Sequence, residues 1–112
     1  MAKKEKKEVE KYILLATPDG FLHQFPAKED TYEQMRELLD GAWLEDVPAA
    51  SLRHKGIHVI VDEEGVLKGL PPCMWCEGFE LYGKVIFCGL KRNGEFGGLT
   101  KEKVQHVFDK IL

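Results

Sequence analysis

The segment IHVIVDEEGVLKGLPPCMWC, residues 57–76, decides the fold of this chain. Its β-branched start, residues 57–61, predicts the clearest strand in the sequence. The acidic turn at 62–65 predicts a second strand segment around Val66 and Leu67, which would complete a hairpin. Pro71 and Pro72 each lack a backbone N–H, so strand pairing is predicted to stop at a Gly-Leu-Pro-Pro corner.

Further strands are predicted on both sides of this segment. Residues 12–17 and 21–25 flank the turn sequence Pro18-Asp19-Gly20 and predict a β-hairpin. In its second strand, residues 21, 23 and 25 should share one side. Residues 42–47 and 84–90 predict two more strands, with the intervening 48–55 as a connection.

Two amphipathic helices are predicted. Thr31 begins the first, residues 32–40, in a capping-box spacing with Gln34, and Gly41 ends it. Its apolar stripe, predicted to be buried, comprises Tyr32, Met35, Leu38 and Leu39. Thr100 caps the second helix, which should dock on the core through Val104, Val107, Phe108 and Ile111.

Strands outnumber helices and do not alternate with them as a parallel sheet requires. We therefore predict an α+β fold, with a mainly antiparallel sheet of about five to six strands and two packed amphipathic helices. The 112 residues suffice for one core. Residues 11–112 are predicted to form a single domain behind a charged, flexible tail, residues 1–10.

Composition excludes several functional classes. The net charge is -3, and through Lys11 the chain has five lysines against three glutamates, so the remainder is acidic and nucleic acid is an unlikely partner. The chain has neither a run of about 18 apolar residues nor a signal-peptide pattern, so we expect a cytoplasmic protein without a membrane segment. The odd number of cysteines, Cys73, Cys76 and Cys88, indicates reduced thiols.

The Cys-Met-Trp-Cys pair allows three interpretations. Two thiolates at this spacing can bind zinc, with further ligands from Cys88 and one of His23, His54 or His58, but a second closely spaced pair is missing. A redox disulfide would need a strand-to-helix junction, which the flanking prolines disfavour. The favoured interpretation is a pair of small apolar thiols packed under Trp75, with no bound metal.

No catalytic constellation is recognisable. The chain lacks a nucleophile motif, and each of its four histidines stands in a separate context, so we expect no enzymatic activity and no cofactor. The carboxylates at 62–64 are predicted to face solvent, since they lack the spacing of a calcium loop. The glycines before Thr100 offer only a weak phosphate-binding signal at a helix start.

The best candidate for a binding surface is the corner that ends the deciding segment. It comprises Gly69, Leu70, Pro71, Cys73, Met74 and Trp75. Rigid prolines beside a tryptophan offer preorganised apolar contact. Trp75 would stack on a base or anchor in a partner, although burial tendencies favour a place in the core. If exposed, Leu70, Met74, Trp75 and Phe79 would form an apolar patch suited to a homo-oligomer.

The order of these motifs resembles a family of small uncharacterised domains of bacteria and their phages. The resemblance rests on DEEGVLKGLPP at 62–72, LYG before GKVIFCG, and the glycine-rich turn into LTKEK at 99–103. Cys73 stands where that family carries asparagine. The resemblance implies a phage or mobile-element accessory protein in the host cytoplasm, one that binds without catalysis. It would sequester a host signal nucleotide or block a host protein. The alternative function is a small structural zinc-binding module that uses the Cys-Met-Trp-Cys pair.

Overall fold

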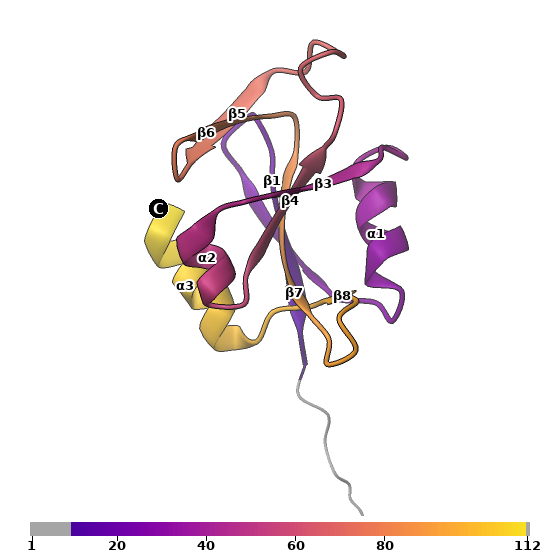
Figure 1. Cartoon of the computed structure of the whole chain (residues 1–112), viewed down its shortest axis with the longest axis vertical. Helices are drawn as coiled ribbons and strands as arrows, with labels where there is room; N and C mark the ends of the chain where they lie inside the picture. The colour runs from indigo at the N-terminus through magenta and orange to yellow at the C-terminus, as the bar shows by residue number, and fades with distance from the viewer. Residues whose placement is uncertain (1–9, 112) are drawn as a thin grey trace, which may run out of the picture.

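The computed structural model describes residues 10–111 and has an α+β fold (Figure 1). The strands are β1 (Tyr12–Ala16), β2 (Leu22–Pro26), β3 (Leu44–Val47), β4 (His58–Asp62), β5 (Pro72–Cys76), β6 (Phe79–Tyr82), β7 (Val85–Leu90) and β8 (Phe96–Gly97). The helices are α1 (Thr31–Leu38), α2 (Ala50–His54) and α3 (Lys101–Ile111). The predicted tail, residues 1–10, lies outside the described residues except for Glu10.

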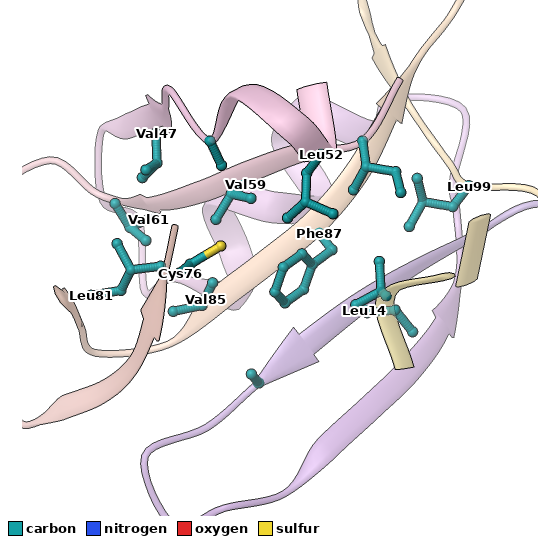
Figure 2. Close-up of a cluster of buried hydrophobic side chains, with 14 of the residues drawn as sticks. Leu14, Val47, Leu52, Val59, Val61, Cys76, Leu81, Val85, Phe87 and Leu99 are labelled. Atoms are coloured by element: carbon teal, nitrogen blue, oxygen red, sulfur yellow. The ribbon is translucent and has the colours of Figure 1, made fainter. Parts of the chain in front are cut away.

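The main sheet is antiparallel, in the order β2-β1-β7-β4-β3, and β8 pairs with β7. The predicted antiparallel sheet of five to six strands is thus confirmed. β5 and β6 form a separate two-stranded ribbon. This ribbon packs over one face of the main sheet and brings the cysteine pair with it (Figures 1 and 2).

The central strand β7 separates two cores, because its side chains alternate between the two faces of the sheet. Val85 and Phe87 point to the face covered by α2, α3 and the ribbon, which holds the first core (Figure 2). Ile86 and Cys88 point to the face covered by α1, which holds the second core. A strand buried on both faces reads as one continuous apolar run, as residues 85–88 do.

Several sequence predictions are confirmed. β1 and β2 form the predicted hairpin, and the rings of Phe21, His23 and Phe25 follow one another on one side at 6.4 Å centroid spacing. The Thr100 hydroxyl accepts a hydrogen bond from the Lys103 N–H at 3.3 Å at the start of α3. The helix buries Val104 and Val107 in the first core as expected.

The predicted hairpin partner for β4 around Val66 and Leu67 is wrong. Residues 63–69 form successive turns, closed by hydrogen bonds such as that from the Leu70 N–H to the Gly65 carbonyl, 3.0 Å. β4 instead pairs with β3 and β7, which are distant from this loop in sequence. The turn after β4 was predicted correctly, but β4 takes its partners from strands that are distant in sequence.

The helix predictions need four corrections. Asp30, not Thr31, caps α1, since its carboxylate accepts from the Glu33 N–H at 3.1 Å. Gln34 does not reach back to the helix start but bonds the Lys28 N–H and the Pro26 carbonyl. Tyr32 is exposed, not buried. The connection at 48–55 contains the short helix α2, whose five residues carry almost no periodic signal.

The glycine-rich turn before α3 serves close packing. A side chain at Gly89 would bring its Cβ within 2.5 Å of the Gly98 carbonyl oxygen. One at Gly98 would clash with Ala27 and Lys11. Only glycine permits backbones to approach this closely. The glycines at 97–98 therefore have a packing role that accounts for them without a phosphate.

Candidate functional site

A cleft of about 410 Å³ opens where the Gly-Leu-Pro corner meets the end of α1 and the turn between β6 and β7. Its walls combine apolar side chains with two lysines and two aspartates. The lining residues are Pro18, Leu39, Asp40, Asp62, Lys68, Leu70, Pro71, Gly83 and Lys84. Apolar walls with a few convergent polar groups are typical of small-molecule sites.

The loop that forms one wall is rigidly built. One oxygen of Asp62 accepts from the Glu64 N–H at 2.8 Å, and the other accepts from Lys68 Nζ at 2.8 Å. The Asp62 side chain is buried, which corrects its predicted exposure, whereas Glu63 and Glu64 face solvent as predicted. The hydrogen bond to Asp62 is the main cause that raises the pKa of Lys68 above its ordinary value. Lys68 therefore stays charged at neutral pH.

The corner closes against the opposite turn. The Gly83 N–H donates to the Pro71 carbonyl at 2.7 Å. Gly83 has a φ of +77°, and a Cβ there would lie 2.7 Å from a methyl carbon of Leu70. The two sequence motifs, Gly-Leu-Pro-Pro and Leu-Tyr-Gly, thus form a single contact across the cleft.

The second lysine comes from the residue that follows this turn. Lys84 Nζ donates to the Leu38 carbonyl at 3.1 Å and lies 3.4 Å from the carboxylate of Asp40. Asp40 is 82% exposed in its side chain and has a left-handed φ of 60° at the end of α1. Its pairing with Lys84 is therefore an exposed ion pair that a competing anion can replace with little loss.

The predicted site residues do not act as one surface. Leu70 and Pro71 line the cleft, and Gly69 precedes them with a φ of +71°. Cys73 and Met74 pack against the first core. Trp75 points the opposite way and is 67% exposed, so its predicted place in the core is wrong. Of the four residues predicted to form an apolar patch, Trp75 and Phe79 are exposed, whereas Leu70 and Met74 are half-buried.

The three cysteines lie in different surroundings. Cys76 is in the first core and Cys88 in the second, on opposite faces of the main sheet. Burial raises the pKa of Cys73 and Cys76, and raises that of Cys88 strongly, so all three favour the thiol form. Within residues 10–111, no three His, Cys, Asp or Glu side chains lie close enough to hold a metal ion.

A histidine and a carboxylate do meet beside one of these thiols. His58 Nδ1 lies 2.9 Å from an Asp46 oxygen, and His58 is directly opposite Cys88 on the neighbouring strand. Cys88, His58 and Asp46 are the residue types of a catalytic nucleophile, a base and an acid that orients the base. Cys88 is fully buried, so no substrate can reach its sulfur. Cys88 belongs to the second core, and the Asp46 carboxylate also pairs with Arg53 at 3.0 Å.

The sequence interpretation missed the four charged residues of the cleft, namely Asp40, Asp62, Lys68 and Lys84. The spacing between Asp62 and Lys68 on a glycine-containing loop was the available signal for the first pair. The second pair joins residues 44 apart in sequence, so only the folded chain places them together.

Gly83→Ala tests whether the corner contact shapes the cleft. We expect it to lower the free energy of unfolding by about 1–3 kcal/mol more than a strain-only control, because the new methyl group overlaps Leu70. Gly78→Ala is that control: its φ is also positive, at +90°, but no atom lies within 4 Å of its Cβ. Urea unfolding of both variants measures the difference. Equal losses would show that the Leu70 contact is unimportant.

Comparison with known families gives one match, and comparisons with curated proteins and with solved structures find none. Across residues 10–111, no helix has the length and apolarity needed to cross a bilayer. The matching family model is described as a domain of unknown function (DUF3846) and covers residues 10–112. It includes the whole described fold, the corner and the cleft. The chain therefore belongs to this family of domains of unknown function, DUF3846.

Proposed function

We propose that this protein is a non-catalytic binding domain whose cleft takes a small anionic ligand of the nucleotide class. The observation that carries the proposal is the pairing of Lys68 and Lys84 with an apolar wall at Leu70 and Pro71 in one cleft. Two ammonium groups suit phosphate oxygens, and the proline and leucine surface suits a flat base. No feature of the cleft requires a chemical step.

The lysines are held ready for an anion. Lys68 is fixed by buried Asp62, and Lys84 by the Leu38 carbonyl. A ligand phosphate would replace the exposed Asp40 beside Lys84 without leaving a buried charge unpaired. Binding therefore needs little rearrangement, which preserves affinity.

A binding role fits the lining better than catalysis. The residues around the cleft include no serine, threonine, cysteine or histidine that could act as a nucleophile or general base. The two aspartates form ion pairs with lysines, Asp62 with Lys68 and Asp40 with Lys84. In the phage or mobile-element setting that the sequence resemblance implies, such a domain would sequester a host signal nucleotide in the host cytoplasm.

Blocking a host protein is the second candidate function, and exposed apolar side chains support it. Leu67 is 86% exposed and Val66 is 70% exposed at the tip of the loop that forms the cleft wall. Trp75 is exposed on the outer side of the β5–β6 ribbon. Rigidly presented side chains of this kind are typical anchors in protein interfaces.

A thermal-shift screen with cyclic and linear nucleotides tests the first candidate. We expect one nucleotide class to raise the melting temperature of the wild-type protein. Lys84→Gln should weaken its binding about tenfold or more, as expected when a charged hydrogen bond to the ligand is lost. Lys101→Gln, an exposed lysine outside the cleft lining, is the matched control and should bind normally.

Two results would reject the nucleotide proposal: no stabilisation by any nucleotide, or equal affinity of the Lys84→Gln variant and the wild type. The protein-partner candidate is tested separately, by capture from host lysate with the wild type and with Leu67→Asp. Loss of one specific partner with the variant, with its fold intact, would favour that candidate. Metal analysis after purification without added zinc tests the zinc alternative.

A further inference from the structure

The outer edge of β2 carries unused backbone hydrogen-bonding groups. The Ala27 N–H donates to the Lys11 carbonyl at 2.9 Å, and hydrogen-bonded pairs alternate along an antiparallel ladder. The odd-numbered residues of β2 therefore bond β1. Leu22 and Gln24 direct their N–H and C=O groups away from the sheet, where β2 has no described neighbour.

This edge lacks the usual protection against pairing. Edge strands are commonly guarded by charged side chains or proline. Residues 21–25, Phe-Leu-His-Gln-Phe, contain neither. Pro26 ends the open stretch, because its outward position has no N–H and its carbonyl accepts from Gln34 Nε2 at 3.0 Å. The available edge is therefore short and sharply bounded.

The side chains beside the edge are suited to a symmetric partner. Phe21, His23 and Phe25 form a row of rings on one side of β2, and Phe21 is 63% exposed. If two such strands run antiparallel with His23 opposite His23, each Phe21 lies opposite a Phe25. Cross-strand aromatic pairs stabilise antiparallel sheets.

We propose that β2 is a homodimer interface, in which it pairs antiparallel with β2 of a second copy about a twofold axis at His23. Leu22 of each copy then lies opposite Gln24 of the other, and these residues exchange four hydrogen bonds.

The charge at the axis provides the first test. Sedimentation velocity of the full chain over a range of concentrations should show a monomer–dimer equilibrium. His23→Lys places two ammonium groups opposite each other and should weaken dimerisation about tenfold or more. His54→Lys, the same change at an exposed histidine of α2, should leave the dimer unchanged. A chain that stays monomeric at all concentrations overturns the proposal.

Cross-linking tests the register and does not depend on measuring the affinity. His23→Cys should form an inter-chain disulfide on mild oxidation, since non-hydrogen-bonded cross-strand pairs bring their side chains close together. His54→Cys is the matched control and should remain uncross-linked. A dimer that persists with His23→Lys, together with no His23→Cys cross-link in a folded protein, would place the interface elsewhere. Circular dichroism and urea midpoints establish that each variant is folded.

Discussion

Phe87→Ala is expected to lower the free energy of unfolding by about 3–5 kcal/mol, the largest effect of any single truncation considered for this chain. Phe87 is fully buried and lies on the central strand β7. It stands between Leu14 of β1 and Val59 of β4 in the ladder (Figure 2). Layers above and below the sheet restrict how far the surrounding side chains can collapse into the space it leaves.

Trp75→Ala is the matched control, because it removes a larger aromatic side chain from the surface. Its expected effect on the free energy of unfolding is within about 0.5 kcal/mol of zero, since Trp75 is 67% exposed. Urea denaturation with one fluorescence-independent probe, such as far-ultraviolet circular dichroism, measures both variants. A loss at Trp75 comparable to that at Phe87 would mean that the ribbon packs differently from the fold described above.

The contrast between these residues shows what sequence reasoning can determine. Phe87 belongs to a continuous apolar run, which predicts a strand buried on both faces wherever it lies in the sheet. Trp75 lies on a strand with a register shift between Pro72 and Met74. Such a shift changes which side chains face the core. Local sequence does not specify it, so the direction of Trp75 was not predictable.

The candidate site was predictable in part for the same reason. Leu70 and Pro71 were identified because proline and glycine determine local backbone geometry. Lys84 and Asp40 were not, because their proximity depends on where α1 ends relative to the turn before β7. Residues brought together by long-range packing leave no fixed spacing in the sequence. The sequence therefore predicts the position of the rigid corner, whereas only the folded structure shows which charged residues lie beside it.

The second large effect is expected at Glu77, which joins the ribbon to two helices. Glu77 and Gly78 form the two-residue turn between β5 and β6, with φ values of 50° and 90° that fit a type I′ turn. The Glu77 carboxylate accepts from the N–H groups of Ser51 and Leu52 at 2.9 and 3.1 Å, and from the Ser51 hydroxyl. It thereby caps α2, whose own preceding residue, Ala49, provides no side-chain cap.

Glu77→Gln should lower the free energy of unfolding at pH 7 by about 1–2 kcal/mol, the range for loss of a helix cap. The neutral amide also loses the ion pair with Lys110 of α3, 3.4 Å away. Glu45→Gln is the control, because Glu45 is an exposed strand carboxylate outside these contacts. Urea unfolding at pH 7 should show a much smaller loss for this control than for Glu77→Gln.

The pH dependence separates the role of the Glu77 charge from that of its shape. Hydrogen bonds from Ser51 are the main cause that lowers the pKa of Glu77 from 4.5 to about 2. Because the folded state holds the ionised form, this stabilisation is complete above pH 4.5 and is lost as the pH falls toward 2. The stability difference between wild type and Glu77→Gln should therefore shrink across that interval. A difference that stays constant from pH 7 to 2 would assign the effect to side-chain packing and not to the carboxylate charge.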